Sequence, residues 1–255
     1  MMALQLLKRR HQRRQASGDW VPPDLSNLVG WWKADAITGL ANNDPVSQWN
    51  DSHTSGNNVS QGTASKKPTY KTNWQNGLPG VYFDGGDLLA LDSVAANFAG
   101  EDKTMTCIAV AKRDVLASQD YFVTCGGTAN KPIIFGLSYE SNNNLALYRR
   151  DDAGFGYVAT AAVGDTTSMH IASAVFRPTT ASSFFNGVVA HDNVAQDFGQ
   201  ITLNTFSLGV WMHDGVPEQY TVGSLCEVLL WKSALSDADR ESVEARLAAK
   251  WGITI

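Results

Sequence analysis

Side chains capable of acid–base or nucleophilic chemistry are few and scattered in this sequence. The six glutamates stand at positions 101, 140, 218, 227, 241 and 244, and the five histidines at positions 11, 53, 170, 191 and 213. None of the histidines has a partner at metal-ligand spacing. The chain also lacks a Gly-x-Ser-x-Gly elbow, a His-Glu-x-x-His pair and a phosphate-binding loop. We therefore expect a protein that is not an enzyme.

Two tryptophans suit a different chemistry, the stacking of an aromatic ring on a sugar. Trp74 in TNWQNG and Trp211 in GVWMHDG stand beside turn residues, where a side chain can stay exposed and contact a glycan. The alternative is that each packs across its own loop. Asp84 and Asp87 in FDGGD could supply two oxygen ligands to calcium, although a plain tight turn explains the same residues. No other cofactor is indicated.

A basic run near the start of the chain contrasts with an acidic remainder. Its five cations are Lys8, Arg9, Arg10, Arg13 and Arg14. Residues 1–20 carry five Lys/Arg against one Asp, whereas residues 21–255 carry fifteen Lys/Arg against twenty-four Asp/Glu. Five charges without interleaved aromatic residues make a weak nucleic-acid site, and the few leucines before them offer too small an apolar face for a membrane-surface helix. We therefore expect an arm that anchors the domain to an acidic partner protein or to a neighbouring copy.

Cysteine content and hydropathy bear on the compartment in which the chain folds. Cys107, Cys125 and Cys226 are odd in number and stand in apolar runs, which predicts buried free thiols rather than disulfides. No run approaches the ~20 apolar residues of a membrane span. The positive charge follows the first apolar residues instead of preceding them, unlike a secretory signal. We expect folding in a cytoplasm without an export signal.

Short apolar runs separated by clusters of Gly, Asn, Asp and Ser predict an all-β domain. The predicted strands are LVGWWKA, PGVYF, DLLAL, TMTCIAVAKR, YFVTC, PIIFGLSY, NLALYRR, MHIASAVFR, SSFFNGVVA, TFSLGVW and SLCEVLLWK. The Asn-Gly pair in FFNGVV predicts a tight hairpin. TMTCIAVA is apolar on both alternating faces, which favours a central strand. Together these runs predict a two-sheet antiparallel sandwich.

One helix is predicted, at residues 236–251. Ser236 opens a Ser-x-x-acid start signal, and Gly252 is placed to end the helix. Val243, Leu247 and Trp251 recur every four residues as a buried stripe, so the helix should cover the sandwich. Residues 1–24 are interpreted as the basic arm and a Pro-containing linker, and residues 25–255 as the folded domain.

Both ends of this domain resemble a known family. LVGWWKADAITGL, DPVSQWND and NGLPGVYFDGGDLLAL within residues 28–91, and LCEVLLWKSALSDADRESVEARLAAKWG at residues 225–252, are similar to the opening and closing parts of a concanavalin A-like lectin/glucanase domain of the laminin-G-like type. The resemblance implies a jelly roll with a core position at Trp31 or Trp32. It implies further core positions at Trp49, Trp231 and Trp251. It also implies a structural, hydrogen-bonding acid at Glu227.

Glucanases of this family carry a Glu-x-Asp-x-Glu run, which is absent here. We therefore predict a non-enzymatic bacteriophage virion protein, a decoration or tail-attachment component assembled in the host cytoplasm in multiple copies. Its arm would bind capsid or tail proteins, and its jelly roll would face outward and contact surface polysaccharide. The alternative is a free-standing bacterial carbohydrate-binding lectin.

Overall fold

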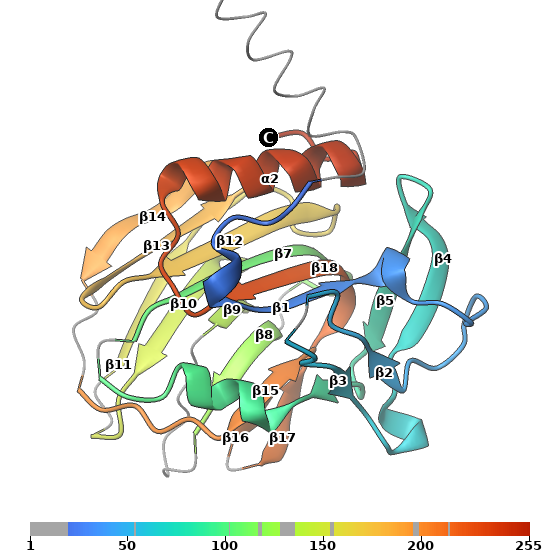
Figure 1. Ribbon diagram of the computed structural model, residues 1–255, viewed down its shortest axis with the longest axis horizontal. Coiled ribbons are helices and arrows are strands. Elements are labelled where there is room, and N and C mark those ends of the chain that lie inside the picture. The colour runs from blue at the N-terminus through green and yellow to red at the C-terminus, as the bar shows by residue number, and fades with distance from the viewer. Residues whose placement is uncertain are drawn as a thin grey trace, which may run out of the picture.

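The computed structural model shows two large antiparallel sheets packed face to face (Figure 1). It describes residues 20–53, 55–101, 103–116, 119–127, 136–153, 156–195, 199–213 and 215–255. The five cations of the basic arm, and so the anchoring prediction, lie outside these ranges. The all-β sandwich predicted from the sequence is confirmed.

The first sheet has eight strands. It runs in the order β14 (Val188–Ala195), β13 (Thr180–Phe185), β12 (His170–Phe176), β7 (Met105–Arg113), β18 (Val222–Trp231), β5 (Leu78–Asp84) and β4 (Thr69–Gln75), with β1 (Leu28–Lys33) also paired to β18. The predicted central strand, TMTCIAVA, is β7, which lies between β12 and β18. Its apolar character on both faces follows from this position, because one face meets the second sheet and the other meets a helix.

The second sheet also has eight strands. It runs in the order β11 (Gly156–Ala161), β10 (Leu145–Arg150), β9 (Gly136–Tyr139), β8 (Asp120–Gly126), β15 (Thr205–Leu208), β6 (Leu89–Ala90), β3 (Val59–Ser60) and β2 (Gln48–Trp49). A separate hairpin of β16 (Val210–His213) and β17 (Val216–Tyr220) lies against β8.

The core lies between the two sheets. Cys107 and Ala109 of β7 point into it, together with Phe122 of β8 and Leu147 of β10, and all four are fully buried. Cys107, Cys125 and Cys226 are free and buried, as predicted. Among the described residues, no helix is both long and apolar enough to cross a membrane.

The predicted helix is present as α2 (Asp237–Trp251) and covers the outer face of the first sheet (Figure 1). The Ser236 hydroxyl accepts a hydrogen bond from the Asp239 backbone N–H at 3.2 Å, and Gly252 ends the helix at a φ of 66°. The predicted stripe of Val243, Leu247 and Trp251 packs with Ile108 and Val110 of β7 in a second apolar cluster. This cluster fixes α2 on the sheet.

Residues 20–24 pack on the sandwich, although they belong to the segment interpreted as a linker. Pro22 is buried, and the Trp231 indole N–H donates to the Pro23 carbonyl oxygen at 2.9 Å. The Trp20 ring meets the Trp31 ring edge to face. The contacts with the domain therefore begin before the expected boundary at residue 25.

Candidate functional site

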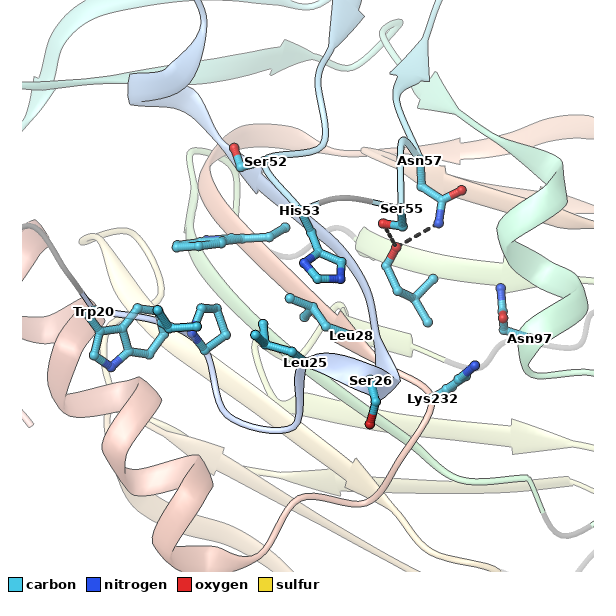
Figure 2. A pocket seen from close by; sticks show the side chains of 14 residues that line it. Trp20, Leu25, Ser26, Leu28, Ser52, His53, Ser55, Asn57, Asn97 and Lys232 are labelled. Atoms are coloured by element: carbon cyan, nitrogen blue, oxygen red, sulfur yellow. Dashed lines mark hydrogen bonds between the residues drawn. The ribbon is translucent and has the colours of Figure 1, made fainter.

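A wide groove of about 770 Å³ lies beside β1, between this N-terminal segment and the turn that follows β2 (Figure 2). We call it the Trp20–Trp31 groove. Trp20, Leu25, Leu28 and Trp31 give it an apolar wall, and the turn contributes His53. The groove thus joins segments that are far apart in the sequence.

Aromatic side chains gather at one end of the groove. The Trp20 and Trp31 rings are 5.7 Å apart at 78°, an edge-to-face pair, and both side chains are half-buried. Figure 2 shows the His53 imidazole pointing into the same space, near Leu28. Partly exposed aromatic rings of this kind can pack against the apolar face of a sugar.

Asp51 holds the turn that carries His53. Its Oδ1 accepts the backbone N–H groups of Trp31, at 2.8 Å, and of His53, at 2.9 Å. Its Oδ2 accepts the Asn57 backbone N–H at 3.2 Å and the Ser55 hydroxyl. Because one carboxylate binds both β1 and the turn, the two walls of the groove are fixed relative to each other.

Polar groups lie along the remainder of the groove. The Ser55 hydroxyl and the Asn57 amide both donate to the Val29 carbonyl oxygen, at 2.9 and 2.7 Å, as the dashed lines in Figure 2 show. The Asn57 Oδ1 atom, the His53 ring and the Lys232 ammonium have no hydrogen-bond partner among the described residues. The groove therefore offers donors and an acceptor beside aromatic surface. None of its described lining residues is an Asp or a Glu.

Glu227 of β18 lies behind Trp31, and it is only 1 % exposed. Its Oε1 accepts the Trp31 indole N–H at 2.6 Å, while its Oε2 accepts the Trp251 indole N–H at 2.9 Å and the Lys250 ammonium at 2.6 Å. The predicted hydrogen-bonding role of this acid is confirmed. The same contacts orient the Trp31 ring at the groove wall.

The structure places Trp74 on β4, away from the Trp20–Trp31 groove. The side chain is half-buried and lines a second groove of about 530 Å³ with Gln75 and Lys112. Its indole N–H donates to the Ser224 hydroxyl at 3.0 Å. The ring lies so close to Gly80 that a Cβ there would approach Trp74 Cδ1 to 2.6 Å. The Trp74 side chain is thus packed against Gly80 and hydrogen-bonded to Ser224, while part of it remains accessible in the second groove.

Trp211 lies on the β16–β17 hairpin, over the outer face of the second sheet. Its ring is 5.7 Å from that of Tyr121 at 40°, in a small apolar cluster that includes Tyr148. Burial raises the pKa of the Tyr121 hydroxyl well above its usual value. Trp74 and Trp211 belong to different sheets, so the structure does not bring the two predicted glycan contacts into one site.

Asp84 and Asp87 bind the turn that contains them. Asp87 Oδ2 accepts the Asp84 backbone N–H at 3.0 Å, and Asp84 Oδ1 accepts the Gly86 backbone N–H at 2.9 Å. Burial raises the pKa of the Asp87 carboxyl to about 6. In the part of the chain that the structure describes, no three His, Cys, Asp or Glu side chains gather as a metal ion would require. The geometry agrees with the tight-turn interpretation of this pair.

Comparison with known families matches residues 83–239 to a family described as the concanavalin A-like lectin/glucanases superfamily. The chain belongs to this superfamily. The match confirms the resemblance seen in the sequence and agrees with the jelly-roll sandwich. A comparison with curated proteins finds no match.

Solved structures with this fold include sialidases and carbohydrate-binding modules. Trypanosoma rangeli sialidase in complex with sialic acid superposes with a TM-score of 0.62 and 14 % identity, over 99 % of this chain and 40 % of the sialidase chain. The CBM40 of Ruminococcus gnavus IT-sialidase bound to α2,3 sialyllactose gives a TM-score of 0.54 and 17 % identity, over 65 % of this chain and 96 % of that one. This lectin-like domain therefore spans less than half the length of the sialidase. At such identities the likeness shows the fold alone.

The aromatic end of the groove was not predicted from the sequence. Trp20 stands next to Val21, Pro22 and Pro23, and the prolines led to its interpretation as part of a linker. Tryptophan side chains are highly buried on average in folded proteins. Trp20 itself was therefore a signal that this segment packs on the domain. His53 carried no such signal, because its position depends on the contacts of Asp51.

Proposed function

We propose that this concanavalin A-like domain is a carbohydrate-binding module whose ligand lies in the Trp20–Trp31 groove. The observation that carries the proposal is the arrangement of side chains in that groove. An edge-to-face tryptophan pair stands at one end, and Asn57, His53 and Lys232 offer polar groups without partners among the described residues. Sugar rings need this combination, because their faces are apolar and their edges carry hydroxyl groups.

We further propose that the domain does not hydrolyse the bound glycan. Most glycosidases place two carboxyl groups about 5 to 9.5 Å apart across the scissile bond. Among the residues that the structure describes, those that line the Trp20–Trp31 groove include neither Asp nor Glu. The buried acid behind the Trp31 ring, Glu227, already accepts three hydrogen bonds from Trp31, Lys250 and Trp251. This arrangement favours binding over general acid catalysis.

Alanine substitution of three tryptophans tests the location of the site. The variants Trp20→Ala, Trp74→Ala and Trp211→Ala would each be compared with the unchanged protein by affinity electrophoresis in laminarin, mannan, polygalacturonate and heparin. For a polysaccharide that retards the protein, we expect Trp20→Ala to weaken binding about tenfold, the effect of one lost aromatic stacking contact. Trp74→Ala and Trp211→Ala should bind as the unchanged protein does.

Two results would contradict the proposal. One is unchanged retardation of the Trp20→Ala variant combined with loss in Trp74→Ala or Trp211→Ala, which would move the site to a tryptophan predicted from the sequence. The other is the absence of retardation across a broad glycan array. Release of reducing sugar from a bound polysaccharide would contradict the non-enzymatic role alone.

We propose, as the setting of this module, display on a bacteriophage virion through the basic arm. The supporting observation is the charge contrast in the sequence, with five cations in residues 1–20 and an acidic remainder. Removal of residues 1–18 should abolish incorporation into particles and leave glycan retardation unchanged. A free-standing bacterial lectin, the alternative, would show no partner that depends on the arm.

A further inference from the structure

A second hollow, of about 260 Å³, shares both tryptophans with the Trp20–Trp31 groove. Its other walls come from β1 and the 3-10 turn after it (Ala34–Ala36), from β18 and from α2, and we call it the Trp31–Arg246 pocket. Charged side chains line it, namely Lys33, Asp35, Glu227, Arg246 and Lys250. The tryptophan pair therefore lies between the groove, where Lys232 is the one charged side chain among the described lining residues, and a small pocket lined mainly by charged side chains.

Both carboxylates of this pocket already have a partner. The Lys250 ammonium donates to Asp35 Oδ1 at 2.8 Å and to Glu227 Oε2 at 2.6 Å. Glu227 also accepts the two indole N–H groups of Trp31 and Trp251. One lysine thus contacts both carboxylates of the pocket wall.

The two other cations of the pocket lack a carboxylate partner among the described residues. Arg246 stands one helical turn before Lys250 on α2, an arrangement in which two like charges destabilise a helix. The Lys33 ammonium lies 4.2 Å from the centre of the Trp31 ring. Among the described residues, three cations against two carboxylates leave an excess of one positive charge in this partly enclosed pocket.

From this arrangement we infer that the Trp31–Arg246 pocket receives an anionic substituent, a carboxylate or a sulfate ester, of the glycan bound in the Trp20–Trp31 groove. The inference rests on the proposed function and narrows its ligand to acidic sugars. A guanidinium group binds such oxyanions with two parallel hydrogen bonds, and an ammonium group adds a point charge. The small volume suits one charged group at the edge of a sugar ring.

The experiment compares matched ligands by isothermal titration calorimetry with the full chain. The probes are galacturonic acid trisaccharide, its carboxyl-reduced neutral counterpart, and a monosulfated neutral trisaccharide. We expect at least one acidic probe to bind about tenfold more tightly than the neutral probe, because charge-assisted hydrogen bonds are the stronger ones. A comparison of the carboxylated probe with the sulfated probe shows which of the two anionic groups the pocket binds more tightly.

Charge-neutralising variants locate the effect. Arg246→Gln and Lys33→Gln should each remove most of the preference for the acidic probe and leave the affinity for the neutral probe unchanged. Lys66→Gln is the matched control, because it removes one positive charge from a turn that lines neither hollow. The basic arm is present in the variants and in the unchanged protein. Any attraction of the arm for the acidic probes is therefore the same in all of them.

The outcomes separate this inference from the proposed function. If the neutral and acidic trisaccharides bind equally and Trp20→Ala weakens both, the pocket inference is wrong and the proposed function stands. If an acidic preference survives in both Arg246→Gln and Lys33→Gln, the anion lies elsewhere and the inference is again wrong. If none of the probes binds and a broad glycan array is also negative, both the inference and the proposed function fail.

Discussion

The carboxylate of Glu227 connects three parts of the molecule at the scale of single residues. It accepts hydrogen bonds from Trp31 of β1 and from Lys250 and Trp251 of α2, while its own backbone belongs to β18. Its position, as one acid in the apolar run CEVLLW, made a structural role predictable. Its partners were not predictable, since Trp31 is 196 positions away in the sequence.

Replacing this acid should destabilise the domain strongly. Glu227→Ala leaves two indole N–H groups and part of the Lys250 charge without an acceptor, so we expect a loss on the order of 3 kcal/mol in the free energy of unfolding. Urea unfolding followed by tryptophan fluorescence measures it. The exposed Glu101→Ala serves as the control and should change stability by less than about 0.5 kcal/mol. A Glu227→Ala protein as stable as this control would show that the network contributes nothing.

His170 makes stability depend on pH. Its ring is fully buried, stacked at 4.8 Å on Phe185, and its Nε2 is hydrogen-bonded to the Tyr139 hydroxyl. Burial lowers the pKa of His170 from 6.5 to about 4, although Ser168 and Asp165 act in the opposite direction. The unfolded chain therefore binds more protons than the folded chain between pH 6.5 and 4.

The contribution of the neutral His170 ring to the free energy of unfolding is complete above pH 6.5. It is lost as the pH falls from 6.5 to 4. We expect it to remove on the order of 3 kcal/mol of stability between pH 7 and pH 4. Thermal unfolding across this range would show the loss, and a His170→Gln variant should show a shallower slope because the titrating group is gone. Identical slopes in the two proteins would contradict the assignment.

At the scale of elements, each apolar run predicted as a strand forms one, but β4 and β11 were not predicted, and β11 was missed although its sequence, GYVATA, is mostly apolar. The eleven runs predicted from the sequence all correspond to strands, although part of PIIFGLSY lies outside the described residues. β4 was missed because its sequence, TYKTNWQ, is mostly polar. The turn between β4 and β5 could have been predicted, because Asn76 and Gly77 form an Asn-Gly pair like the predicted Asn186–Gly187 turn. Both residues have positive φ, 50° and 76°. In the sequence this pair was interpreted as turn residues beside Trp74, but not as a hairpin between two strands.

The α2 helix was predicted correctly because its end signals are local. Ser236→Ala removes the hydroxyl that accepts the Asp239 N–H, and we expect it to cost about 1 kcal/mol of stability. Ser236→Asp restores an acceptor and should unfold at nearly the urea concentration of the unchanged protein. Equal stability of the Ala and Asp variants would mean that a hydrogen bond from the Asp239 N–H to the side chain at position 236 does not stabilise the domain.

At the scale of the whole molecule, the candidate site is the part that the sequence could not reveal. The groove needs the N-terminal segment at Trp20, the turn at His53 and the chain after β18 at Lys232, which only the fold brings together. The tryptophans chosen from neighbouring turn residues, Trp74 and Trp211, lie elsewhere. Turn chemistry indicates exposure of a side chain, whereas a binding groove depends on long-range packing, which no local pattern encodes.

The central claim is that a glycan lies in the Trp20–Trp31 groove, and the NMR signals of the tryptophan indole N–H groups test it most directly. The protein would be titrated with whichever oligosaccharide a glycan array identifies. We expect the Trp20 and Trp31 indole signals to move with a common saturating dependence on ligand concentration, while those of Trp74 and Trp211 stay in place. Movement of the Trp74 or Trp211 signal with Trp20 and Trp31 unchanged would contradict it.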